Sequence, residues 1–356
     1  MKQRKEKFKP LKFPRDEQKH DHIIEWWYFN GHLKTKNGRT FSYMNTLFAA
    51  KPNKVAIPLA KRLPLKTWYF AHYLLTDHQK QKVWSKIVPV SFVDKKSFTL
   101  PLLWVQYDNS CLLVETKLFN YQIVNDLVDL NLSAKKKPLL VNNKGFIDLG
   151  DKATYYYSLS RLKTKGLIKA GKKWLEVSGL SWMDHQWAQT PLTKNDKWTW
   201  FSLQLNNGID IICFVYGDKN KIFHATMLDK NNRQKITNNL FLKIGRIKYA
   251  SPDTGAIYQL DYEIYLPDWD LKLNVKPLNR KQEMVFGPLN YWEGPIKVEG
   301  MYFGKKISGQ GFLEITGCPM KKSVLKVYLN KFKKDLTNHP LKKISKEISE
   351  RFKAYD

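Results

Sequence analysis

The sequence contains little cysteine, and its three cysteines lie far apart, at Cys111, Cys213 and Cys318. They form no CxxC pair and no even-numbered framework, so neither a zinc knuckle nor a disulfide scaffold is supported. No uninterrupted apolar run approaches the roughly 18 residues of a transmembrane helix. The basic start, MKQRKEKFKP, is followed by no apolar segment of the kind found in secretory signals. We therefore expect a cytoplasmic protein.

Signatures of several common enzyme classes are also missing. The chain has no GxSxG elbow, no Gly-rich phosphate loop, no HExxH pair and no Rossmann fingerprint. Their absence argues against a serine hydrolase, a nucleotide-dependent enzyme and a thermolysin-like protease. From the sequence we predict neither an organic cofactor nor a bound metal ion.

Arginine is scarce for so basic a chain, because only nine of its 61 basic residues are arginine. The 32 acidic residues leave a formal net charge of +29. Arginine is the usual reader of phosphates and guanine, and the lysines are spread along the whole chain. We therefore expect a solvated lysine-rich surface and not a nucleic-acid site. The same charge predicts a peripheral attraction to anionic membranes.

The chain does contain enough hydrophobic residues for a large core, and its apolar residues alternate with polar ones along many short stretches. Its 356 residues suggest two domains, and 43% of them are hydrophobic. Alternating apolar residues over 258–266 are typical of a strand buried on one face, and 155–159 and 201–205 repeat the pattern. Many short strands separated by turn signals are typical of sandwiches and barrels. We predict an all-β protein.

A polar stretch at 189–196 is the best boundary between two β-units. The expected organisation is an extended lead-in over 1–20, one barrel over 21–195, a second over 196–335 and a basic amphipathic helix over 336–356. Apolar residues at 341, 344, 348 and 352 share one face of that helix. This helix could pack on the outside of a barrel or lie on a membrane surface.

Three groupings could carry chemistry, and the first is HDHIIEWWYFNGHL at 20–33. Histidines flanking Glu25 suggest a metal site, although a strand sends neighbouring side chains to opposite faces, so they need not converge. A buried Glu25 would be either a proton donor or a structural anchor. In strand geometry one face carries Glu25, Trp27 and Phe29, and the other carries Trp26, Tyr28 and Asn30.

The second and third groupings are SWMDHQWAQTPL at 181–192 and CFVYGD at 213–218. Strand spacing puts His185 and Trp187 on one face and Asp184 on the other. An imidazole beside an indole can handle a proton and a cation together, but a packed core histidine has the same spacing. Tyr216 and Asp218 also share a face, as an acid with its partner or as a strand end running into a turn.

Three segments in fixed order resemble the AttH-type, carotenoid 1,2-hydratase-like proteins, also described as hydroxyneurosporene synthase homologues. They are EWWYFNGHL (25–33), WMDHQW (182–187) and YWEGPIKVEGMYFGKKISGQGFLEITG (291–317), and the resemblance runs from Phe13 to Gly317. It implies two consecutive lipocalin-like β-barrels. It also implies a cavity at the domain junction that takes apolar or polyene ligands.

In the hydratase branch of that family, water is added across an isoprenoid double bond without a cofactor. The resemblance implies that a His-x-Trp pair and a Tyr-x-Asp pair are catalytic, here His185 with Trp187 and Tyr216 with Asp218. Asp218 would be the buried acid, Trp187 and Tyr216 would stabilise a carbocation, and His185 would position water. Expected to bind substrate or support the site are Glu25, Trp27, Tyr28, Trp182, Asp184, Tyr291, Trp292 and Glu293.

Two details depart from the family pattern: Ala188 stands where glycine is common, and TGCP (316–319) replaces the more usual aromatic after TG. The expected function is that of a hydro-lyase acting on a hydrophobic isoprenoid or polyene. The alternative is a non-catalytic carrier of hydrophobic ligands, because the same barrels and aromatic residues would serve either role.

Overall fold

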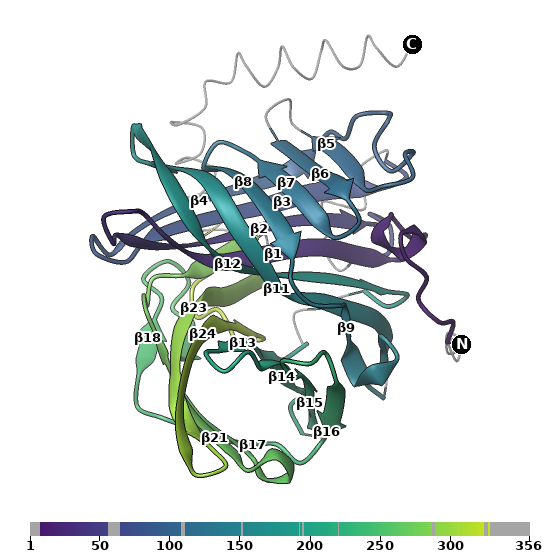
Figure 1. The fold of residues 1–356 in the computed structure, drawn as a ribbon. Coiled ribbons are helices and arrows are strands. Elements are labelled where there is room, and N and C mark those ends of the chain that lie inside the picture. Colours follow the sequence, from purple (N-terminus) through teal and green to yellow (C-terminus); the bar gives the residue numbers. More distant parts are fainter. Residues whose placement is uncertain are drawn as a thin grey trace.

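The computed structural model describes residues 8–55, 65–107, 111–150, 152–191, 193, 196–219, 221–286, 289–323 and 327. Two large antiparallel sheets lie one above the other (Figure 1). The predicted all-β class and the two successive barrel-like sheets are thus confirmed. The helix expected over 336–356 lies outside the described residues. Within those ranges, no helix has the length and apolarity needed to span a bilayer.

The first sheet forms a nearly closed barrel. Its strands follow the order β4-β3-β2-β1-β12-β11-β8-β7-β6-β5, and a bridge between Val93 and Tyr107 brings its two ends together. Strands β9 and β10 pair with β11 outside this path. Its strands are Ile24–Lys34 (β1), Thr40–Ala50 (β2), Trp68–Asp77 (β3), Lys82–Ser91 (β4), Trp104–Tyr107 (β5), Cys111–Lys117 (β6), Asn120–Val124 (β7), Val128–Ala134 (β8), Leu139–Leu140 (β9), Phe146–Asp148 (β10), Ala153–Ala170 (β11) and Lys173–Ala188 (β12).

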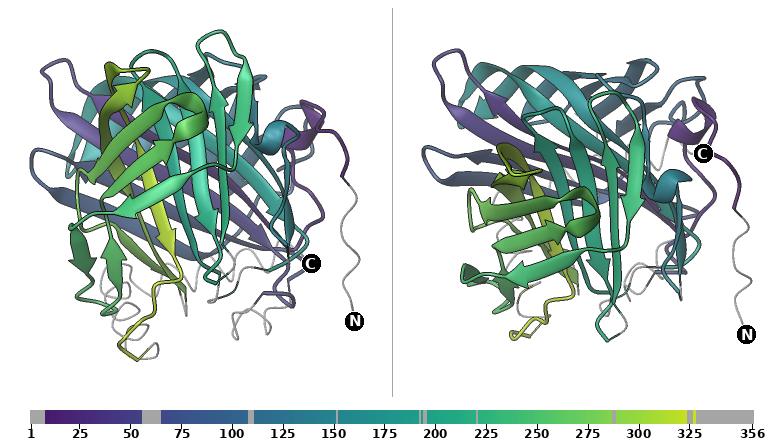
Figure 2. Two further views of the ribbon diagram at one scale, coloured as in Figure 1. Left: turned by 90° about the horizontal axis from the view of Figure 1, so that it is seen from below. Right: turned by 60° about the horizontal axis from the view of Figure 1, so that its bottom comes forward.

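The second sheet curves into a half-barrel below the first (Figure 1, Figure 2). Its order is β16-β15-β14-β13-β24-β23-β21-β20-β17, with β22 paired to β23, while β18 and β19 form a separate pair. Its strands, with that pair, are Trp198–Leu205 (β13), Asp210–Tyr216 (β14), Ile222–Leu228 (β15), Gln234–Thr237 (β16), Phe241–Ile244 (β17), Lys248–Ala250 (β18), Ile257–Gln259 (β19), Tyr262–Leu266 (β20), Leu271–Pro277 (β21), Glu283–Phe286 (β22), Leu289–Tyr302 (β23) and Lys305–Thr316 (β24). Short 3-10 turns occur at Arg15–Glu17 (η1), Val141–Asn143 (η3) and Pro267–Trp269 (η4).

Strands β1 and β12 form a wall with two buried faces. They pair antiparallel with Trp27 opposite His185, so alternate side chains of each strand point either into the first barrel or toward the second sheet. Trp27 belongs to the first barrel's core, whereas Tyr28 and Trp182 pack with Trp200 of the second sheet. Each such buried aromatic contributes on the order of 1.5–3 kcal/mol. The near-continuous apolar character of these strands follows from this two-sided burial.

A buried charge cluster fastens the two sheets together. Asp210 on β14 is fully buried; its Oδ1 lies 2.6 Å from Arg161 Nη2 on β11, and its Oδ2 lies 2.8 Å from Lys136 Nζ. Ser160 on β11 donates a further hydrogen bond to Asp210. Both cations belong to the first sheet's part of the chain, so this carboxylate ties the second sheet to the first.

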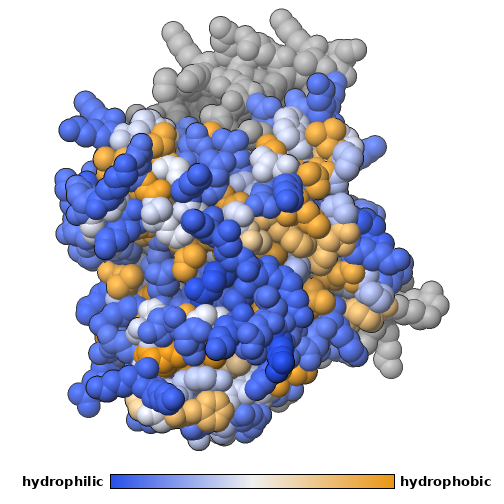
Figure 3. Space-filling model, in the orientation of Figure 1, coloured by the Kyte–Doolittle hydropathy of each residue, from blue (hydrophilic) through white to orange (hydrophobic). Residues whose placement is uncertain are grey.

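The outer surface is predominantly hydrophilic on the face shown in Figure 3, with apolar side chains scattered among polar ones. Several exposed lysines form ion pairs with exposed partners, such as Lys297 with Glu299. Pairs of this kind contribute little to stability.

Candidate active site

A cavity of about 880 Å³ lies between the two sheets. This volume is within the upper part of the roughly 300–1,000 Å³ range of small-molecule sites. Residues of both sheets line it, so neither sheet alone forms the site. Its wall is largely aromatic and includes Trp26, Phe48, Trp68, Phe70, Trp198, Trp200, Phe214 and Phe286.

Two carboxyl groups face this cavity from neighbouring strands. Glu293 on β23 and Glu314 on β24 are directly opposite in the register, so their side chains share a face of the sheet. Two buried carboxyls this close cannot both ionise without large cost. Burial, and then the charge of Glu314, raises the pKa of Glu293 well above its usual value. Burial also raises the pKa of Glu314 to about 7.

Glu293 is held by a short chain of hydrogen bonds from the first sheet. The Tyr28 hydroxyl donates to Glu293 Oε1 at 2.7 Å, and Asn30 Nδ2 donates to the same hydroxyl at 2.8 Å. Tyr28 comes from β1 and Glu293 from β23, so this contact spans the two sheets. Its raised pKa favours the protonated form, which suits Glu293 to act as an acid.

A third carboxyl group, Asp184 on β12, lines the same cavity from the first sheet. It accepts hydrogen bonds from Ser158 Oγ at 2.5 Å, Trp182 Nε1 at 2.6 Å and Tyr156 OH at 2.7 Å. Burial raises the pKa of Asp184 to about 7, while these three donors act in the opposite direction. Asp184 therefore ionises near neutral pH, whereas the environment of Glu293 favours its protonated form. One cavity thus holds an acid and a base.

His185 and Trp187, which were predicted to line the cavity, are not among the residues that line it. They do share a face of β12, with Asp184 on the other, but their face points into the first barrel. His185 Nε2 lies 2.8 Å from Glu25 Oε1, and His185 Nδ1 lies 3.1 Å from Tyr157 OH. Burial lowers the pKa of His185 to about 4, so the ring is neutral. The prediction that His185 and Trp187 line the cavity is therefore wrong. Both faces of β12 are buried, and it is the face with Asp184 that meets the cavity.

The expectation of a buried acid at Asp218 is also wrong. Strand β14 ends at Tyr216, and Gly217 has a φ of +97°, so the chain turns before Asp218. The side chain of Asp218 is 66% exposed at the cavity rim and pairs with Lys197 at 2.7 Å. That pairing lowers its pKa. Tyr216 does line the cavity, but its hydroxyl donates to Asp196 Oδ1 at 2.8 Å.

The residues expected to support the site divide between three places. Tyr291 lines the cavity, and its hydroxyl lies 2.6 Å from His72 Nδ1. Trp292 is in the core of the second sheet and donates to the Arg280 carbonyl. The cavity brings together Tyr28, Asp184, Tyr291 and Glu293, with Trp182 behind Asp184, whereas Glu25 and Trp27 lie in the first barrel.

Sequence reasoning missed several cavity residues. Glu314 stands in the apolar strand GFLEIT, where an acid between Leu313 and Ile315 was the available signal. Tyr156 was passed over inside TYYYS, although its alternation with two barrel-facing tyrosines, Tyr155 and Tyr157, sets it apart. For His72 the equivalent signal was a histidine inside the run YFAHYLL of β3.

Comparison with solved structures places the fold among known ones. A protein described as AttH from Nitrosomonas europaea matches with a TM-score of 0.73 and 24% identity, over 87% of this chain and 98% of that one. Kievitone hydratase from Nectria haematococca matches with a TM-score of 0.70 and 17% identity, over 86% and 93%. CghA with Sch210972 matches more distantly, with a TM-score of 0.53 and 11% identity, over 85% and 90%.

At these identities the solved structures establish the fold alone. No curated protein sequence matches the chain. The AttH-like family, however, matches residues 4–318, which is most of the chain and includes both sheets and nearly all residues that line the cavity between them. The protein belongs to the AttH-like family.

Proposed function

We propose that this protein is a hydro-lyase that adds water to a carbon–carbon double bond of an apolar isoprenoid or polyene bound between the two sheets. The observation that carries the proposal is that Glu293 and Asp184, two buried carboxyl groups whose pKa values are raised by burial, line one aromatic cavity between the sheets. Kievitone hydratase, a hydratase by name, shares the fold and adds support. The family resemblance suggests a carotenoid-type substrate.

The proposed reaction begins when Glu293 transfers its proton to one carbon of the double bond. The π electrons form the new C–H bond and leave a tertiary carbocation on the other carbon. Faces of Trp198, Trp200 and Tyr216 line the cavity and attract positive charge. A water molecule then attacks the cation while Asp184 accepts its proton. The net reaction adds one water molecule to the double bond. Asp184 then releases its proton to solvent, and Glu293 takes one up.

Tyr28 favours the charged intermediate over the ground state in this scheme. Its hydroxyl already points at Glu293, so the same hydrogen bond strengthens when Glu293 becomes a carboxylate. Interactions that strengthen along the reaction lower its barrier, whereas equal binding of both states does not. Asn30 holds the Tyr28 oxygen from behind and keeps the donor aimed at the acid.

A non-catalytic carrier is the second candidate, and the aromatic wall favours it. The buried carboxyls argue against it, because an apolar passenger gains nothing from them and each costs free energy to desolvate. The two functions separate cleanly in an experiment. A carrier binds a polyene and returns it unchanged.

The test is incubation of purified protein with neurosporene or lycopene in isotope-labelled water, followed by chromatography and mass spectrometry. We expect a hydroxylated product carrying the label. Glu293→Gln should lower the rate about 100-fold or more, since it removes the proton donor while keeping an oxygen for Tyr28. Glu299→Gln, an exposed position on the same strand, is the matched control and should leave the rate unchanged. Polyene retained but unaltered would support the carrier and refute the hydratase.

A further inference from the structure

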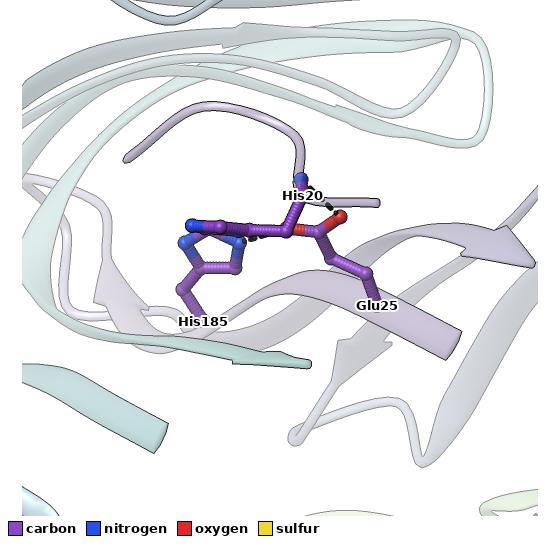
Figure 4. A group of neighbouring side chains, drawn as sticks. All are labelled: His20, Glu25 and His185. Carbon is purple, nitrogen blue, oxygen red and sulfur yellow. Dashed lines mark hydrogen bonds and ion pairs between the residues drawn. The ribbon is translucent and has the colours of Figure 1, made fainter. Parts of the chain in front are cut away.

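A second group of polar side chains lies on the opposite face of the β1–β12 wall, inside the first barrel. His20, Glu25 and His185 point toward one another there (Figure 4). Glu25 Oε1 lies 2.7 Å from His20 Nδ1 and 2.8 Å from His185 Nε2. The three donor atoms all lie within 4.8 Å of one another. The chain thus brings two imidazoles and a carboxylate to one point across more than 160 residues.

Strand pairing explains this convergence. Trp27 is directly opposite His185 in the register, so Glu25, two residues earlier on β1, is the diagonal neighbour of His185 on the same face. His20 precedes β1, and its backbone N–H donates to Glu25 Oε2 at 2.8 Å. The Trp187 indole stacks on the His20 ring, with centroids 3.8 Å apart and planes 8° apart. All three side chains are therefore fixed in place.

The outer nitrogen of each imidazole also has a partner. His20 Nε2 lies 3.3 Å from Asp16 Oδ1, and His185 Nδ1 lies 3.1 Å from Tyr157 OH. Tyr157 in turn donates to Glu17. Histidines that bind metal ions usually have such a partner on their second nitrogen, which fixes the tautomer and orients the ring.

We propose that His20 Nδ1, Glu25 Oε1 and His185 Nε2 bind a divalent transition metal ion, with Zn²⁺ the best match. Two histidines and one glutamate are an established zinc ligand set that leaves a fourth position for water. Zinc bonds of about 2.0–2.2 Å place tetrahedral ligands roughly 3.3 Å apart. The two N···O contacts need to open by only about half an ångström to reach that spacing.

The location separates this ion from the cavity of the proposed hydration site. Glu25 and His185 are buried, and the His20 side chain is 18% exposed, so the ion would enter from the side of His20. Bound there, it would join the segment before β1 to the first barrel's wall. Asp184 and Gln186 line the cavity on the other face of β12, so the two sites are separated by the strand itself.

The test is titration of chelator-treated, full-length protein with Zn²⁺ by calorimetry, and with Co²⁺ by visible absorption. We expect one equivalent to bind, with Co²⁺ bands typical of four-coordinate geometry. His20→Gln should weaken binding at least tenfold and abolish those bands, and Asp16→Asn should weaken it about tenfold through the His20 ring. His22→Gln is the matched control, because His22 is two residues away but outside the triad, and it should bind as the parent does.

His20→Gln is the decisive variant because His20 lies on the partly exposed side of the site. His185→Gln repeats the test from the buried side, with near-ultraviolet circular dichroism to confirm folding. Absence of one-to-one binding to the parent would overturn the proposal. Equal binding by the parent and His20→Gln would also overturn it and assign the ion to another surface. Neither result depends on a substrate, so the hydratase proposal stands or fails separately.

Discussion

Glu17 provides a sharp test of the electrostatics inside the first barrel. It lies in η1 and is fully buried, and its carboxyl group accepts hydrogen bonds from Tyr121 and Tyr157. Burial, followed by the charge of nearby Glu115, raises its pKa to about 8, although the two tyrosines act in the opposite direction. Glu17 is thus largely protonated at neutral pH.

The sign of the effect follows from linkage. The folded state holds the Glu17 proton more tightly than the unfolded state, so stability falls as pH rises from about 4.5 through about 8. A shift of about 3.5 pKa units at about 1.4 kcal/mol each gives an upper bound of about 5 kcal/mol. Glu17→Gln removes this titration and leaves a neutral group that can still bond to both tyrosines. The variant should therefore lose stability less steeply than the parent as pH rises.

The measurement is urea unfolding of both proteins at pH 5, 7 and 9, with chelator present so that metal binding does not vary. We expect similar stability at pH 5 and a more stable variant at pH 9, by a few kcal/mol and at most about 5. Glu299→Gln, at an exposed position, should follow the parent throughout. Parallel curves for the parent and Glu17→Gln would refute the reasoning.

Two further predictions concern the cavity and the contact between the sheets. The rate of hydration should be bell-shaped in pH: it should rise as Asp184 ionises near pH 7 and fall as Glu293 loses its proton, and Asp184→Asn should abolish the rising limb in a stopped-time assay. Asp210→Asn should lower the free energy of unfolding in urea by about 3–5 kcal/mol, because two largely buried cations lose their charge partner. The matched change in the exposed Lys86–Asp126 pair should cost less than about 1 kcal/mol, and equal effects would contradict the reasoning.

Alternation along single strands could be predicted from sequence, but the partner of each face could not. The division of His185 and Trp187 from Asp184 is correct because it needs only strand geometry. Which face meets the cavity depends on how the second sheet packs, and both faces of β12 are apolar enough to be buried. Asp218 was misplaced for a local reason, since the alternation was carried past Gly217, where the backbone turns.

Pairing across long stretches of chain decided the remainder. Glu293 and Glu314 face each other only because β23 and β24 pair in one register. His20 and Glu25 meet His185 only because β1 pairs with β12, and strand spacing alone had left their convergence open. No local pattern encodes these registers. The pair of glutamates in the cavity and the cluster of two histidines and a glutamate in the first barrel could therefore be recognised only from the structure.

The two-sided wall of β1 and β12 also limits how this protein can change. Substitution at an even-numbered position of β12, such as Asp184, alters the cavity and leaves the barrel-facing His185 in place. Deletion of one residue within 183–187 would reverse every later side chain, sending barrel groups into the cavity and cavity groups into the barrel. New substrate preferences can therefore arise on this wall through point substitutions, whereas its length has to stay constant.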